Sequence, residues 1–143
     1  MFVNEIQIIN YPKNFGKIIS SHEAYKFLIE IWEANTLSVN EQFKVLFLNN
    51  SNIIHGYKTI SIGGITQTVV DVRIILSLAL KTLSTGIIVA HNHPSGQLKP
   101  SHADIKITEK LSKAAEYFDI RVLDHLILSP NNDYYSFADE GLI

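Results

Sequence analysis

Cysteine is absent from this chain of 143 residues. Its absence excludes disulfides, thiolate metal ligands and a cysteine nucleophile, and it leaves the redox compartment undetermined. Long apolar runs are absent too, since none reaches the ~18 residues that a membrane-spanning helix requires. The first residues form neither a basic region nor a long apolar region, so we expect no signal peptide. The default expectation is a cytoplasmic protein without a membrane partner.

A strong charge of either sign is also missing, because the formal net charge is only −2. No overall positive field would draw the protein to DNA, so the composition does not favour a nucleic-acid partner. The apolar fraction of 46% and the charged fraction of 18% are ordinary for a globular protein. The length fits one domain with a full core, while the oligomeric state stays open.

Hydrophobic periodicity predicts helices and strands in alternation. We expect residues 1–19 to form an N-terminal arm, either a short strand or an extended segment, and residues 20–143 to form one domain. The expected helices span residues 20–35, 70–83 and 101–118, and the expected strands span 41–48, 53–62, 87–90 and 120–128, with a short strand after a turn at 130–133. This order predicts an α/β fold of three layers, a mixed β-sheet flanked by helices.

The segment after the apolar run 86–90 contains the strongest candidates for metal ligands. His91 and His93 stand two residues apart at the end of a predicted strand, where alternate side chains point to the same side. Asp104 follows eleven residues after His93, on the buried stripe of the next helix, in line with Ile107 and Phe118. Two imidazoles and a carboxylate around one divalent ion leave a position open for water, which is typical of a catalytic zinc site.

Other interpretations of these residues were weighed. Ser101 and Asp104 also form a capping-box pattern, whose simplest meaning is helix initiation. Two histidines and a carboxylate also describe a non-haem iron site, but the order along the chain is reversed here. Three consecutive letters His-Asn-His do not indicate the nuclease family of that name, in which the residues are dispersed.

The pattern His-x-His-Pro, six residues, Ser, two residues, Asp resembles the metal motif of the JAMM (MPN+) metalloproteases, with every position filled. The longer text His91-Asn92-His93-Pro94-Ser95-Gly96 resembles the bacterial RadC family within that group. The resemblance covers roughly residues 20–143 and includes 123–125 and 135–137. It implies the JAB/MPN fold, which is related to that of cytidine deaminases.

The resemblance also implies a function, zinc-dependent hydrolysis of peptide or isopeptide bonds in a peptide or protein substrate. His91, His93 and Asp104 would bind Zn²⁺, Glu41 would act as general base, and the Ser101 hydroxyl would stabilise the oxyanion. One alternative is a non-catalytic interaction module. Another is a DNA-associated accessory protein, although the roughly 20 residues ahead of the first helix are too few for the helix-hairpin-helix region of longer family members.

One of Asp124 and His125 could support a ligand imidazole from behind, and a satisfied core histidine is the competing interpretation. We expect His22, His55 and His102 to lie at the surface.

Overall fold

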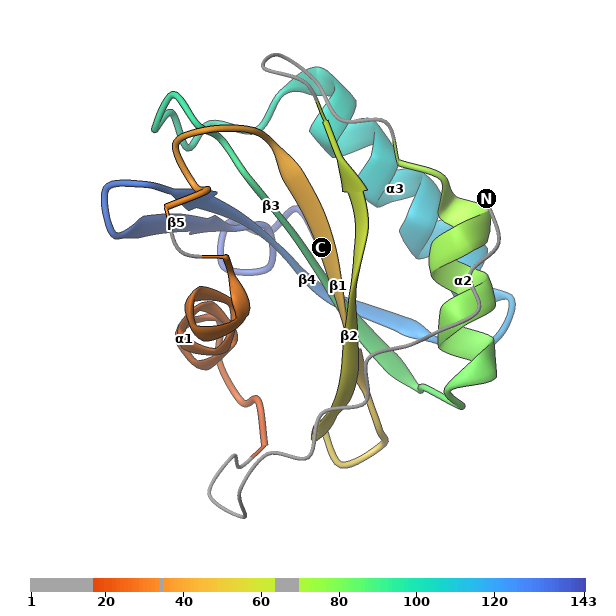
Figure 1. Ribbon diagram of the computed structural model, residues 1–143. Helices are drawn as coiled ribbons and strands as arrows, with labels where there is room; N and C mark the ends of the chain where they lie inside the picture. The colour runs from red at the N-terminus through yellow and green to blue at the C-terminus, as the bar shows by residue number, and fades with distance from the viewer. Residues whose placement is uncertain (1–16, 34, 64–69) are drawn as a thin grey trace.

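The computed structural model describes residues 17–33, 35–63 and 70–143. In these ranges a five-stranded mixed sheet has the strand order β2-β1-β3-β4-β5 (Figure 1). The elements, in chain order, are α1 (Ser21–Ile31), β1 (Gln42–Leu48), β2 (Ile54–Ile62), α2 (Val72–Lys81), β3 (Gly86–Asn92), α3 (His102–Glu116), β4 (Arg121–Ser129) and β5 (Asp133–Ser136). The arm expected over residues 1–19 lies largely outside the described residues.

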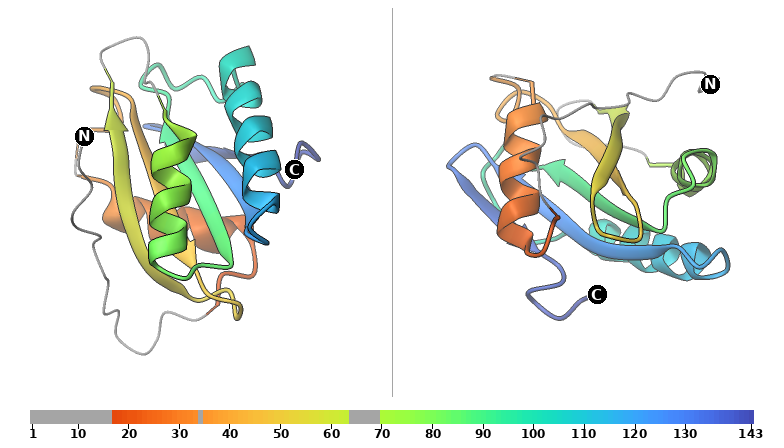
Figure 2. Two further views of the ribbon diagram at one scale, coloured as in Figure 1. Left: turned by 90° about the vertical axis from the view of Figure 1, so that its right-hand side faces the viewer. Right: turned by 90° about the horizontal axis from the view of Figure 1, so that it is seen from below.

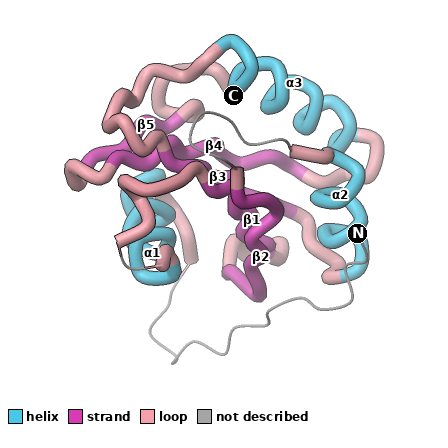
Figure 3. Tube along the Cα trace, turned by 45° about the horizontal axis from the view of Figure 1, so that its top comes forward, coloured by secondary structure: helices cyan, strands magenta, loops and turns pink. Residues whose placement is uncertain are grey.

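The sheet is covered on both faces. Helix α1 lies on one face, and α2 and α3 lie on the other (Figures 2 and 3). The expected mixed sheet flanked by helices is therefore confirmed. The sheet is mixed because β3 pairs antiparallel with β1 and parallel with β4.

Two hydrophobic cores follow from the alternation of side chains along the central strands. Phe47 and Val89 face α2 and α3, whereas Leu46 and Ile88 face α1. Strands β1 and β3 are buried along their whole length. For β3 the continuous apolar run before His91 indicates this burial, since a strand covered on both faces needs apolar residues at every position.

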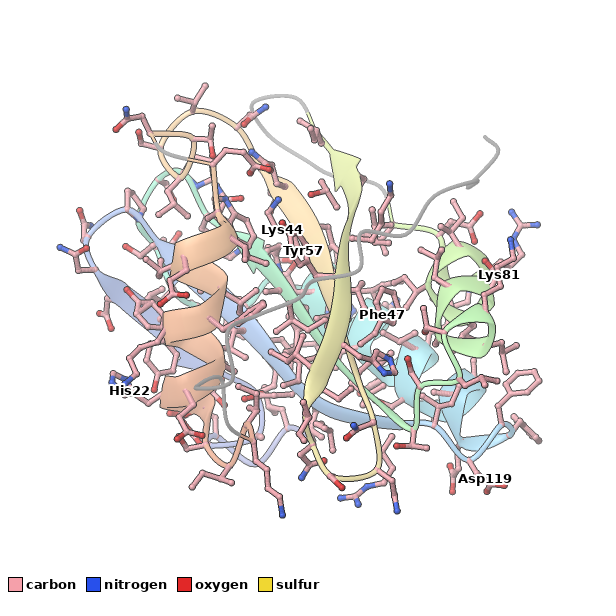
Figure 4. The ribbon with its side chains drawn as sticks, turned by 60° about the horizontal axis from the view of Figure 1, so that its bottom comes forward. His22, Lys44, Phe47, Tyr57, Lys81 and Asp119 are labelled. Carbon is pink, nitrogen blue, oxygen red and sulfur yellow. The ribbon has the colours of Figure 1, made fainter. Side chains whose placement is uncertain are left out.

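Lys44 is the exception on β1, a fully buried cation on the α1 side of the strand, opposite Phe47 (Figure 4). Its Nζ atom lies 3.0 Å from a Glu33 carboxylate oxygen and 2.6 Å from the Thr59 hydroxyl, and 4.9 Å from the centre of the Trp32 ring. Burial lowers the pKa of Lys44, and the Glu33 carboxylate opposes that shift. These contacts fasten the segment after α1 to the sheet.

The helices are shorter than expected at both ends. Helix α1 ends at Ile31, because Trp32 adopts an extended conformation. Leu80 is 45% exposed, and Phe118 at the end of the predicted stripe is 52% exposed. Leu80 lies in the last turn of α2, and Phe118 follows the C-terminal end of α3. No described helix is long and apolar enough to cross a membrane.

Candidate metal centre

The C-terminal end of β3 and the N-terminal end of β1 lie side by side, and this places the candidate residues. His91 pairs with Phe43 across the two antiparallel strands. Glu41, which immediately precedes β1, is therefore brought beside His93, which immediately follows β3. The β3–α3 crossover then returns the chain, so the first turn of α3 brings Asp104 to the same place.

The ligand atoms of these four residues converge. The two imidazole Nε2 atoms of His91 and His93 lie 2.9 Å apart. Asp104 places Oδ1 3.3 Å from the His91 Nε2 and Oδ2 3.3 Å from the His93 Nε2. A Glu41 oxygen is more distant, 3.8 Å and 4.0 Å from the same two nitrogens. The structure thus brings together both histidines and both carboxylates.

The donor set fits a divalent metal ion. Glu41, His91 and His93 offer ligand atoms that all lie within 4.8 Å of one another. The Asp104 oxygens lie closer to the two histidine nitrogens than the Glu41 oxygen does. Bond lengths of 2.0–2.1 Å in a tetrahedral zinc site separate neighbouring ligand atoms by roughly 3.3–3.4 Å. The distances from Asp104 match that separation, the 2.9 Å between the two histidine nitrogens is shorter, and the distances from Glu41 exceed it.

Asp104 has two structural tasks. Its Oδ2 accepts the Ser101 backbone N–H at 2.8 Å, and the Ser101 hydroxyl accepts the Asp104 backbone N–H at 3.0 Å. This capping box begins α3 and fixes the carboxylate. Ser101 itself is exposed at the edge of the site. The capping interpretation and a role of Asp104 in the site are therefore compatible.

The electrostatics of the cluster favour positive charge. Burial would raise the pKa of Asp104, but hydrogen bonds from His91 and His93 hold that pKa well below its ordinary range. Burial likewise acts to lower the pKa of His93, but the Asp104 carboxylate and the Gln97 carbonyl raise it overall. Acceptors that draw a proton in this way also attract a metal cation.

One tautomer follows directly from the backbone. The His93 Nδ1 atom lies 2.6 Å from the carbonyl oxygen of Gln97. Because a carbonyl only accepts, this nitrogen carries the hydrogen. The neutral ring of His93 therefore presents an unprotonated Nε2 to His91 and Asp104, as a metal ligand must.

A second histidine supports His91 from behind. The His91 Nδ1 atom lies 2.7 Å from the Nε2 atom of His125, which is fully buried on β4. Its ring stacks on Phe137 at 4.4 Å and contacts the edge of Phe43 at 5.8 Å. Burial, and then the neighbouring charge of His91, lower the pKa of His125 well below its ordinary range. The structure thus brings His125, of the pair 124–125, to the site.

Asp124 instead holds the C-terminal segment. Its carboxylate accepts the Ser136 hydroxyl at 2.6 Å and the Ala138 backbone N–H at 3.0 Å. Burial raises the pKa of Asp124, and these hydrogen bonds oppose that shift.

Asn92, between the two histidines, fastens the segment that carries Glu41. Its amide NH₂ donates to the carbonyl oxygens of Leu37 at 2.8 Å and Asn40 at 2.9 Å. Its amide oxygen accepts the Gln42 backbone N–H at 2.8 Å. These three hydrogen bonds enclose Glu41 on both sides, and Asn92 is fully buried.

The sequence interpretation did not identify Asn92 as part of the site. Alternation along β3 contained the signal, since the residue between two histidines on one face must point to the other. His22 and His102 are exposed as expected. The expectation for His55 is wrong, because its side chain is half-buried and its Nε2 lies 2.9 Å from the Ser84 hydroxyl.

Comparison with known proteins decides the family. A model of the RadC-like JAB domain matches residues 18–142. The chain belongs to the RadC-like JAB domain family. The family model matches almost the whole described chain, and the family implies the MPN fold.

Similar proteins of known sequence support the same family assignment. A UPF0758 protein of Flavobacterium johnsoniae is 48% identical over 126 residues, 88% of this chain and 53% of the relative. UPF0758 protein LL1007 of Lactococcus lactis is 39% identical over 99% of this chain and 60% of its own. UPF0758 protein YeeS of Escherichia coli is 45% identical over 72% of this chain and 69% of its own. The chain spans about half the length of the first of these relatives.

The hydrogen bonds of Asn92 yield a prediction about stability. Asn92→Ala removes the hydrogen-bond partner of one buried N–H and of two partly buried carbonyls, so we expect a loss of about 2 kcal/mol in the free energy of unfolding. Urea denaturation of metal-free protein measures it. The control is Asn50→Ala at an exposed turn position, expected within about 0.5 kcal/mol of wild type. Equal stabilities of the two variants would contradict the role assigned to Asn92.

Proposed function

We propose that this domain is a zinc-dependent hydrolase of peptide or isopeptide bonds in a peptide or protein substrate. The observation that carries the proposal is a convergence of acceptor atoms: the Nε2 atoms of His91 and His93 lie 2.9 Å apart, and each has one Asp104 carboxylate oxygen at 3.3 Å. Facing lone pairs and carboxylate oxygens repel unless a proton or a metal cation lies among them. Membership of the RadC-like JAB family supports the same conclusion.

His91, His93 and Asp104 are the proposed ligands, through the two Nε2 atoms and a carboxylate oxygen. Two neutral imidazoles and one carboxylate leave a bound Zn²⁺ with net positive charge and an open position. When bound, the metal supplies a water of lowered pKa and polarises the substrate carbonyl.

Glu41 is the proposed general base. Its side chain is only 15% exposed and lies at the outer edge of the ligand cluster. The 3.8 Å and 4.0 Å from its carboxylate oxygen to the two histidine Nε2 atoms exceed the separation expected between two ligands of one zinc ion. From there it can take the proton of a water held near the two histidines and deliver it to the leaving amine. Asn92 holds the backbone on both sides of Glu41 in place.

Ser101 is the proposed hydrogen-bond donor to the developing oxyanion. Its oxygen accepts the Asp104 backbone N–H, which leaves the hydroxyl hydrogen to point elsewhere. Exposure at the edge of the site makes the hydroxyl accessible to a substrate. Oxyanion stabilisation of this kind contributes substantially to acyl-transfer catalysis.

The metal assignment predicts about one zinc ion per chain in protein purified without chelators. His91→Ala, His93→Ala and Asp104→Ala should each lose it, and elemental analysis by mass spectrometry measures the content. Because protons compete for the Nε2 atoms, zinc affinity should fall as the pH drops below roughly 6.5. Full zinc content in all three variants would refute the ligand set.

Glu41→Gln separates a general base from a ligand. The variant keeps the size of the side chain but loses its proton affinity, so zinc content should match wild type while hydrolysis falls by about 10²-fold or more. New peptide termini in a proteome incubated with wild type or with Glu41→Gln, compared by mass spectrometry, provide the readout and identify substrates. Loss of zinc in this variant would make Glu41 a ligand instead.

Ser101→Asp separates the cap from the oxyanion donor. Aspartate caps a helix as well as serine does, so the melting temperature should stay near that of wild type, whereas Ser101→Ala should cost about 1 kcal/mol. An ionised aspartate has no hydrogen to donate and places negative charge beside the oxyanion, so Ser101→Asp should be inactive. If it cleaves substrate at the wild-type rate, Ser101 is a helix cap alone.

A further inference from the structure

We propose that Thr108 and His125 act together as positioning residues that fix the tautomer of His91. The pair connects His91 to the turn of α3 that carries Asp104. The inference deepens the proposed metal centre, and its metal-affinity readout rests on that proposal. The measurement of the histidine tautomers is independent of the proposed metal centre, because it is made on metal-free protein.

The direction of the hydrogen bonds starts from a backbone carbonyl. The Thr108 hydroxyl lies 2.8 Å from the carbonyl oxygen of Asp104, one helical turn earlier. A carbonyl only accepts, so the single hydroxyl hydrogen of Thr108 is used in this bond. The same hydroxyl lies 2.5 Å from the Nδ1 atom of His125. Thr108 must accept in this second bond, so the Nδ1 atom of His125 carries a hydrogen.

The next link is His125 itself. Its ring lies between Phe43 and Phe137 and is fully buried. A buried ring in these surroundings is stable only in the neutral form, so the hydrogen on Nδ1 leaves its Nε2 as an acceptor. This Nε2 lies 2.7 Å from the Nδ1 atom of His91, which therefore donates.

The consequence reaches the ligand cluster. With its hydrogen on Nδ1, a neutral His91 presents an unprotonated Nε2 toward His93 and Asp104. His93 reaches the same tautomer through the Gln97 carbonyl of its own loop. His91 lies mid-sheet, where backbone carbonyls are used in strand pairing, and depends on two side chains from α3 and β4 instead.

Loss of the Thr108 hydroxyl would remove the contact that keeps the hydrogen of His125 on Nδ1. His125 could then place its hydrogen on Nε2, which would force His91 to accept at Nδ1 and to carry its own hydrogen on Nε2. That hydrogen would occupy the position that a metal ion needs. The Thr108→Val variant has nearly the shape of wild type but lacks the hydroxyl, and Thr108→Ser keeps it.

A matched control exists on α2. The Thr82 hydroxyl, at the end of that helix, also lies 2.8 Å from a carbonyl oxygen four residues earlier, that of Leu78. Thr82→Val therefore removes the same kind of hydrogen bond without touching His125. Any effect common to Thr82→Val and Thr108→Val would reflect lost helix stability rather than the tautomer.

The experiment has two measurements. Long-range ¹H–¹⁵N spectra of metal-free protein at about pH 9, where the rings are neutral, identify the protonated nitrogen of each histidine, and a His91→Gln spectrum assigns the His91 signals. Titration with Zn²⁺ against a chromophoric chelator gives the dissociation constant for each variant.

We expect His91 and His125 to be protonated on Nδ1 in wild type, Thr108→Ser and Thr82→Val. In Thr108→Val we expect Nε2-protonated His91 to appear and zinc affinity to fall about tenfold or more, the usual scale for lost support of a ligand. Nε2 protonation of His91 in wild type, or an unchanged tautomer in Thr108→Val, would overturn the inference. If the tautomers are as expected but wild type binds no zinc, the inference holds and the proposed function fails.

Discussion

The need of buried polar groups for hydrogen-bond partners is the constraint on which this site depends. Strand β3 enters the core as apolar sequence and ends in His91 and Asn92, both buried. Each of these side chains must find partners inside the protein. Those partners come from β1, β4, α3 and the segment before β1, so the elements around the site are held by the polar end of one strand.

The two faces of β3 carry residues with different roles. Toward α2 and α3, His91 contacts His125 and the ligand cluster. Toward α1, Asn92 holds the segment that carries Glu41. One residue thus supports the proposed metal ligands and its neighbour supports the proposed base, because a strand presents successive side chains to opposite faces. A shift of register by one residue would exchange these roles and abolish the site.

The sequence was sufficient for the element types, the mixed sheet and the meeting of Glu41, His91, His93 and Asp104. Strand alternation and the capping box are short-range signals and carried this information for His91, His93 and Asp104, whereas Glu41 was assigned from the resemblance to the JAMM metalloproteases. The partnership of His91 with His125 could not be predicted with certainty, because the two residues are 34 positions apart and the register of β4 against β3 decides it. The ends of the helices were also imprecise, since they depend on where the core stops rather than on local pattern.

Asp104 begins α3 and also faces the two histidines, and with the proposed metal bound this double role would link folding to metal supply. Any opening of the first turn of α3 withdraws the carboxylate, and any ion that binds the carboxylate holds the turn closed. A ligand that binds only the folded form stabilises it in proportion to the logarithm of its concentration, by about 2.7 kcal/mol at one hundred times the dissociation constant. The persistence of the folded domain in a cell would then report how much metal that cell has available.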